Sequence, residues 1–197
     1  MDFKLTGANI VLLANKHNPS IASKDWLKDK GIINEDITNF THLPVASMVE
    51  TDNINFFIDQ DTLQISIKKI SQEYLIKLAQ MVLKYANSLP ETPYSALGFN
   101  YVYNIDVEQD KLKNVFLVHE EKLQNIFSND YQFGGIVKFP FEGFLITLKM
   151  IPDNEKIKAD FNFHFELNNK SDLAEKLFGH LKTEEEAKKI IRMLLDV

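Results

Sequence analysis

The sequence feature that most constrains the fold is a strict alternation of apolar and polar residues from Lys156 to Asn168. Successive side chains of a β-strand point to opposite faces, so this alternation predicts a strand with one apolar and one polar side. Antiparallel sheets commonly bury one face and leave the other in water, and we therefore expect a central strand of such a sheet. The apolar side carries Ala159, Phe161, Phe163, Phe165 and Leu167, and the polar side carries Asp160, Asn162, His164, Glu166 and Asn168.

The composition is that of a folded globular chain. Its 197 residues are 45% hydrophobic, include 15 phenylalanines, and therefore supply enough apolar surface for a sizeable core. Charged residues make up 25%, which is an ordinary value for a globular domain. We expect one α+β domain over residues 1–197.

Charge and residue usage exclude several classes of function. The net charge of −6 makes nucleic acid an unlikely partner. Arg192 is the only arginine, so a site that binds phosphate or guanine through planar guanidinium groups is hard to build. The chain has no cysteine, which excludes disulfides and thiol chemistry. Its longest early apolar run, residues 8–14, is too short to span a membrane. These features predict a cytoplasmic protein without a membrane partner.

Hydrophobic periodicity places the other elements. Alternating residues predict strands, and apolar residues three and four apart predict amphipathic helices. We expect helices over 24–30, 72–88, 108–127, 172–178 and 184–195, and irregular structure over 32–43. Ser71, Ser171 and Thr183 are the expected caps at the starts of the second, fourth and fifth of these helices. The expected strands are 8–14, 45–50, 53–59, 62–69, 99–107, 136–139, 143–151 and 156–168.

This reading gives an α+β fold with an antiparallel sheet of seven or eight strands and helices on one face. Residues 8–90 and 94–197 each read as strand, helix, three strands, helix, and this suggests an internal duplication with two βαβββα halves related by a pseudo-two-fold axis. The alternative is coincidence, because groups of strands alternating with helices produce such similarities readily.

The candidate binding face consists of Asp160, Asn162, His164 and Glu166 on the predicted central strand. His164 and Glu166 project in parallel about 7 Å apart, which would suit a metal with a third ligand from a neighbouring strand or a general acid–base pair. The simpler interpretation is a solvated sheet face. We therefore assign no catalytic, cofactor-binding or metal-binding residue and expect no cofactor.

Three other motifs are weak. His119-Glu120-Glu121 begins like a zinc-binding helix, but position 123 is Leu123 and not a second histidine, so we expect His119 at the edge of a core stripe. Gly134-Gly135 predicts a bend before a strand. Tyr101 and Tyr103 lie on the apolar side of a strand and predict core packing, with hydroxyls that need partners at its rim.

Two functional hypotheses remain. The first is a non-enzymatic interaction module that uses the polar sheet face or a strand edge to bind a protein partner or a second copy of itself. The alternative is a small-molecule binder or hydrolase with a pocket between sheet and helices, built around His164, Glu166, Asp160 and Tyr103.

Overall fold

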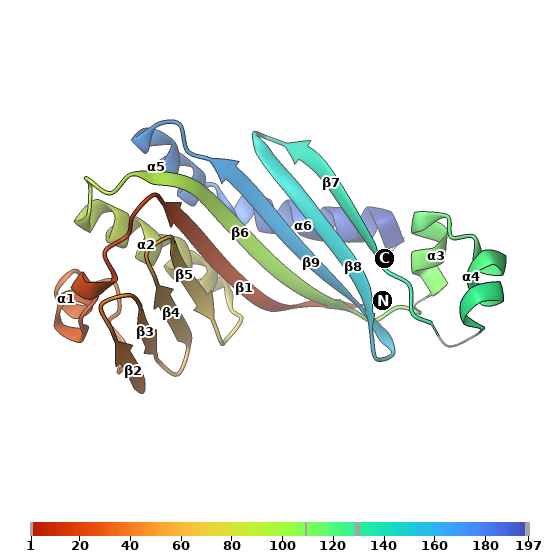
Figure 1. Ribbon diagram of the computed structural model, residues 1–197, viewed down its shortest axis with the longest axis horizontal. Coiled ribbons are helices and arrows are strands. Elements are labelled where there is room, and N and C mark those ends of the chain that lie inside the picture. Colours follow the sequence, from red (N-terminus) through yellow and green to blue (C-terminus); the bar gives the residue numbers. More distant parts are fainter. Residues whose placement is uncertain (1, 109, 129–130, 196–197) are drawn as a thin grey trace.

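The computed structural model describes residues 2–108, 110–128 and 131–195 (Figure 1). Within these ranges nine strands form one antiparallel sheet in the order β2-β3-β4-β5-β1-β6-β9-β8-β7. The strands are β1 (Phe3–Ala14), β2 (Asn39–His42), β3 (Ser47–Glu50), β4 (Ile54–Ile58), β5 (Thr62–Ile67), β6 (Tyr94–Ile105), β7 (Gly135–Phe141), β8 (Phe144–Asp153) and β9 (Lys156–Glu166).

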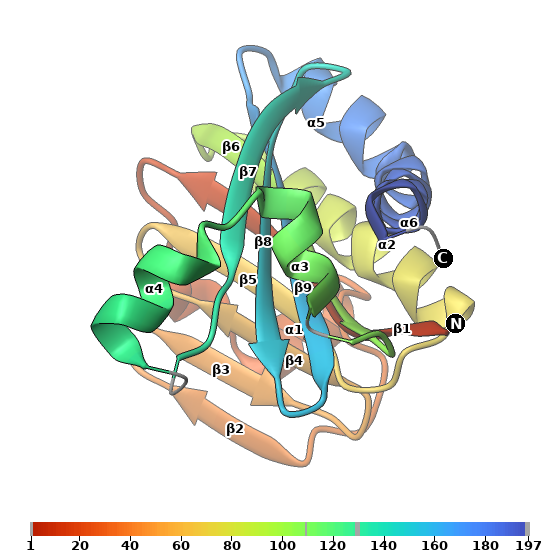
Figure 2. The same ribbon diagram turned by 90° about the vertical axis from the view of Figure 1, so that its right-hand side faces the viewer.

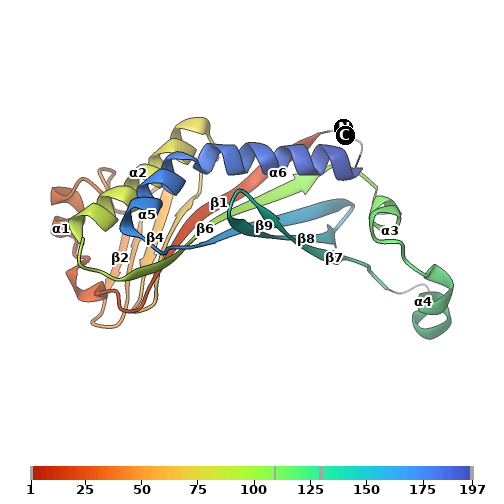
Figure 3. The same cartoon turned by 90° about the horizontal axis from the view of Figure 1, so that it is seen from above.

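The helices are α1 (Lys24–Asp29), α2 (Gln72–Ser88), α3 (Asp110–Phe116), α4 (Glu120–Phe127), α5 (Lys170–Phe178) and α6 (His180–Leu195), and a short 3-10 turn spans Pro19–Ile21. Helices α2, α5 and α6 lie along one face of the sheet (Figure 3). We call this the covered face, and we call the other the open face. Helix α3 lies where β6 ends and β7 begins, next to the C-terminal end of α6, and α4 lies farther out toward the side of the open face (Figures 1 and 3).

The core lies between the covered face and the helices. Alternate residues of the two central strands, such as Leu12 on β1 and Phe99 on β6, are completely buried, as is Phe163 on β9. Helix α2 follows the expected pattern, because Ser71 accepts a hydrogen bond from the Tyr74 amide at its start and its apolar stripe is buried. The predicted α+β fold with helices on one face of an antiparallel sheet is confirmed.

The expected number of strands was too low. Strand β2 lies inside the segment 32–43, for which we expected irregular structure, and pairs with β3 through a turn around Pro44. Its residues, Asn39 to His42, are exposed or half-buried, so the segment carries little apolar signal. The pairing with β3, and not its own sequence pattern, makes this segment a strand.

The expected helix over 108–127 is also corrected. It divides into α3 and α4 at Leu117, whose φ of 50° no α-helix contains. Helix α3 buries Leu112, whereas α4 buries none of its residues. His119 is therefore exposed at the start of α4 and does not border a core stripe.

Two predicted helix starts are wrong as well. Helix α5 begins after Asn169, whose backbone amide donates to the Asp172 carboxylate at 3.2 Å, and not after Ser171. Helix α6 begins at His180, so Thr183 lies inside the helix instead of capping it. The Thr183 hydroxyl donates instead to the backbone carbonyl of His180 at 2.6 Å. A bend was predicted at Gly134-Gly135, but β7 already begins at Gly135, so this glycine belongs to the strand.

The sheet order is symmetric about its centre. Strands β1 and β6 pair with each other, and each also pairs with the last strand of its own half, β5 or β9. Strand β2 has no counterpart at the opposite end of the order. One hydrophobic cluster includes residues from both halves, from Leu5 to Leu195. This order is what an internal duplication would produce, and the duplication itself stays a prediction.

Candidate functional site on the open face of the sheet

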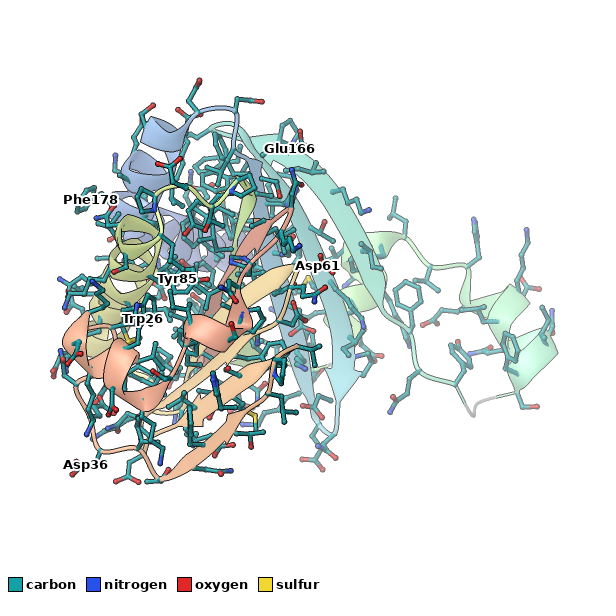
Figure 4. All side chains as sticks on the ribbon, turned by 60° about the vertical axis from the view of Figure 1, so that its left-hand side comes forward. Trp26, Asp36, Asp61, Tyr85, Glu166 and Phe178 are labelled. Carbon is teal, nitrogen blue, oxygen red and sulfur yellow. The ribbon has the colours of Figure 1, made fainter. Side chains whose placement is uncertain are left out.

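The four candidate residues lie on the open face. Asp160, Asn162, His164 and Glu166 alternate along β9 with side chains that are buried against the helices, so they point away from the helix layer. The first three are half-buried, and Glu166 is exposed at the end of the strand (Figure 4). The alternation in the sequence thus places these four side chains together on one surface.

A ladder of asparagine side chains crosses the centre of this face. The Asn162 Nδ2 atom donates to Asn100 Oδ1 at 2.6 Å, and Asn100 Nδ2 donates to Asn9 Oδ1 at 2.8 Å. Asn9, Asn100 and Asn162 are directly opposite one another on the adjacent strands β1, β6 and β9. Asn162 and Asn100 therefore each donate to a neighbour's oxygen, Asn9 accepts at the end of the ladder, and these bonds orient all three groups.

The ladder is the middle of a longer polar row. Following the register outward from Asn9 and from Asn162, every strand contributes a polar residue that faces its neighbour directly. From β2 to β7 the row reads Asn39, Glu50, Asn55, Ser66, Asn9, Asn100, Asn162, Thr147 and Lys138. Sequence reasoning found only Asn162 of this row, because register between strands is a tertiary property.

Apolar residues occupy most of the next row. Met48, Phe57, Val11 and Leu145 lie two residues along their strands from the polar row, on the same face. Met48, Phe57 and Leu145 are exposed although they are large apolar side chains. The open face is therefore not simply a solvated surface, because it joins a continuous polar row to an exposed apolar one.

His164 stands in this second row beside a small residue. It lies opposite Gly98 on β6 and Leu145 on β8. A Cβ atom built on Gly98 would lie 3.7 Å from Asn162 Nδ2 and 3.8 Å from Val11, so its neighbours already line the space beside this glycine at ordinary contact distance. Among the described residues, no group of three or more His, Asp and Glu side chains could hold a metal ion. The arrangement around His164 thus offers polar recognition, not a ready set of metal ligands.

Asp160 lies in a different polar environment. Its carboxylate is 3.6 Å from the ammonium of Lys158, and Lys149 is directly opposite it on β8. The Oδ1 atom of Asp160 is buried and accepts no hydrogen bond from the described residues, and the same is true of Oδ1 of Asn55 in the polar row. The open face therefore carries two acceptors whose hydrogen-bonding capacity its own side chains leave unused.

Tyr103 is separated from these residues by the sheet. Its hydroxyl lies in the core and donates to the Glu184 carboxylate of α6 at 2.8 Å, and Glu184 also pairs with Lys188 at 2.9 Å. The Tyr101 hydroxyl bonds to Thr183 and to the His180 carbonyl, both at 2.9 Å. Burial raises the pKa of both tyrosines, and Glu184 raises that of Tyr103 further. The tyrosines thus pack in the core as predicted, but their hydroxyl partners come from α6.

This placement corrects the pocket expected for a small-molecule binder or hydrolase. His164, Glu166 and Asp160 lie on the open face, and Tyr103 lies on the covered face, so the four groups do not share a cavity. The apolar groove of about 280 Å³ beside α2, α5 and α6 is lined by Ile76, Leu83 and Phe178 among others. Phe178 is on the outer surface of the helix layer (Figure 4). The groove therefore lies outside this layer and contains none of the four groups.

Two further histidines, His17 in a loop and His180 at the start of α6, are buried. The His17 ring bonds to the Tyr85 hydroxyl and the Leu12 carbonyl, both at 3.0 Å. The His180 ring lies between the carbonyls of Leu177 and Leu75, at 2.9 and 2.8 Å. Burial lowers the pKa of both, although these carbonyls favour the protonated ring. Both are structural groups of the covered side and are absent from the open face.

Two comparisons, with protein-family models and with curated protein sequences, find no match. In the part of the chain that the structure describes, no helix has the length and apolar character needed to cross a membrane. A function is therefore argued from the geometry of the open face.

Proposed function

We propose that this protein is a non-enzymatic protein-interaction module that binds its partner with the open face of the sheet. The observation that carries the proposal is the polar row from Asn39 to Lys138, which continues through all nine described strands beside exposed Met48, Phe57 and Leu145. A sheet face that served only solvation would not need to expose these apolar side chains next to an ordered amide ladder.

The chemistry of the face suits a protein surface. Protein interfaces combine apolar contact with a moderate number of hydrogen bonds, and the two neighbouring rows provide both. Strands repeat at about 4.8 Å, so the amides and hydroxyls of the polar row offer hydrogen-bonding groups at a regular spacing.

The charges on the face favour protein over nucleic acid. Lys138, Lys149 and Lys158 carry positive charge, but Asp160 lies among them, and Glu50 adds a negative charge on β3 farther across the same face. A polyanion binds best to a surface of one sign, because each neutralised phosphate contributes to affinity. Mixed signs instead select partners with a complementary pattern of charges.

The experiment is a quantitative affinity capture with matched variants. We expect the double variant His164→Ala/Glu166→Ala to reduce recovery of the true partner by about tenfold or more, because loss of one hot-spot contact changes affinity by more than 1 kcal/mol. The control is Glu73→Ala/Gln80→Ala on α2, which removes two exposed polar side chains from the covered side. If no captured protein depends on the open face while the variants stay folded, the proposal is wrong.

A further inference from the structure

The backbone edge of β7 is a second feature of the sheet, next to the open face on which the proposed function rests. Strand β7 is the last in the sheet order, and within the described ranges its seven residues, Gly135 to Phe141, pair on one side only, with β8. Figure 2 views the molecule from this end and shows β7 along the outside of the sheet. Unpaired strand edges present N–H and C=O groups that can pair with another chain.

The hairpin between β7 and β8 determines which of these groups point outward. Glu142 and Gly143 form a two-residue turn with φ of 44° and 83°, the signs of a type I′ turn, so Phe141 and Phe144 close it as a hydrogen-bonded pair. Hydrogen-bonded and non-hydrogen-bonded pairs alternate along an antiparallel ladder. The backbone groups of Ile136, Lys138 and Pro140 therefore point away from β8.

Proline occupies the outward position where its missing N–H does no harm to the ladder. Pro140 cannot donate, so within β7 the outward N–H groups are those of Ile136 and Lys138. Pro140 thus blocks pairing in the last part of the strand and leaves the first part free. Natural edges are also protected by charge, and Lys138 is the only charged residue of β7.

The side chains of the free part are apolar and exposed on both faces of the sheet. Ile136 on the open face is 61% exposed, and Val137 on the covered face is 36% exposed. At the opposite edge, β2 has only four residues and carries Asn39, Thr41 and His42. The two edges therefore differ in length and polarity, and β7 is the one suited to pairing.

We propose that β7 pairs antiparallel with β7 of a second copy of this chain, about a two-fold axis at Val137. In this register the Ile136 N–H and C=O meet those of Lys138 of the second copy, and the reverse contact repeats by symmetry. Every outward N–H within the strand is then used. Val137 of one chain lies opposite Val137 of the other across the two-fold axis. Both chains therefore use the same surface, and the pairing ends at a dimer.

Charge favours the register centred on Val137 over the register centred on Lys138. A pairing centred on Lys138 would place two like charges directly opposite each other, which destabilises a strand pair. It would also place the Ile136 carbonyl opposite Pro140, which has no N–H to donate. The Val137-centred register avoids both, and the two sheets would join into one.

Solution mass gives the first test. We expect light scattering after size exclusion to report twice the monomer mass of 22.8 kDa. Ile136→Lys puts a lysine opposite Lys138 of the second copy and should return the mass to that of the monomer. The matched control is Thr41→Lys on the open face of the other edge strand, which should stay dimeric. A wild-type chain that is monomeric up to high micromolar concentration overturns the proposal.

Cysteine crosslinking tests the register. The chain has no cysteine of its own, so single-cysteine variants give unambiguous products. Val137→Cys brings two sulfurs together at a non-hydrogen-bonded pair with Cα atoms about 4.5 Å apart, within disulfide range. Ile136→Cys separates its two copies by about 8 Å, which exceeds that range. We expect about tenfold more oxidised dimer from Val137→Cys, and equal yields from both would overturn the register.

Rates of amide hydrogen exchange distinguish a dimer paired through β7 from a dimer that forms through another surface. The Ile136 and Lys138 amides should exchange slowly in the dimer and at least about tenfold faster in Ile136→Lys, while the inward Val137 and Phe139 amides stay protected in both. A dimer with fast exchange at Ile136 and Lys138 pairs elsewhere and contradicts the proposal. The open-face variant His164→Ala/Glu166→Ala should remain dimeric, so failure of the edge pairing and failure of the open-face function are distinguishable.

Discussion

The Tyr103 hydroxyl donates to the Glu184 carboxylate at 2.8 Å, and this contact ties the central strand β6 to helix α6 inside the core. Glu184 has one further charged partner, Lys188. A buried carboxylate needs such partners because water no longer solvates it.

Tyr103→Phe removes this donor and should lower the free energy of unfolding by about 1–3 kcal/mol, the usual result of leaving a buried acceptor unsatisfied. Urea unfolding followed by circular dichroism measures the change. Replacing Glu184 by Gln in the same background should reduce the penalty, because a neutral amide is less costly to bury. Additive effects of the two substitutions would show that the contact contributes little.

The asparagine ladder should be cooperative. Asn100 makes two side-chain hydrogen bonds, whereas Asn9 and Asn162 each make one within the ladder. Asn100→Ala should therefore destabilise more than Asn9→Ala, by about 1 kcal/mol, the net contribution of one hydrogen bond. Denaturant midpoints of both single variants and of the double variant form the test. Equal penalties for Asn9 and Asn100 would mean that the ladder is too hydrated to stabilise the sheet.

Stability should fall in mild acid because of His17. Burial lowers the pKa of this histidine in the folded chain, while in the unfolded chain it keeps its usual value of about 6.5. As the pH falls below 6.5 the unfolded chain binds the proton first, so the free energy of unfolding decreases. His180 contributes in the same direction.

Urea titrations at pH 8, 6.5 and 5 measure this dependence. In His17→Gln the decrease between pH 8 and pH 5 should be smaller than in the parent chain, whatever the variant's stability at pH 8. Gln80→Ala, an exposed and non-titratable position on α2, serves as the control and should keep the full decrease. An unchanged pH dependence in His17→Gln would show that this histidine titrates alike in both states.

Two glycines should respond differently to alanine. A Cβ on Gly134 would lie 2.7 Å from the Met150 carbonyl oxygen, a backbone atom that cannot swing away. A Cβ on Gly98 would meet its nearest atom at 3.7 Å, an ordinary contact. We expect Gly134→Ala to lower the free energy of unfolding by about 1–3 kcal/mol through overpacking and Gly98→Ala to change it by less. Thermal unfolding of both variants decides, and similar melting temperatures would contradict the expectation.

Local periodicity predicted most of the fold from the sequence. The alternation at residues 156–168 placed β9 and both of its faces, and the stripe of α2 was found together with its Ser71 cap. These predictions hold because the periods of two and 3.6 residues are local properties of the backbone. Asp160, Asn162, His164 and Glu166 were correctly placed on one face for the same reason.

Other features were decided by contacts between distant segments. Strand β2 exists because β3 pairs with it, and α4 leaves the core because the backbone turns at Leu117. The polar row needs the register of nine strands, and Asn9 and Asn100 are far apart in the sequence. Periodicity gives the face of each side chain but not its neighbour on the next strand, and only the tertiary structure supplies that neighbour.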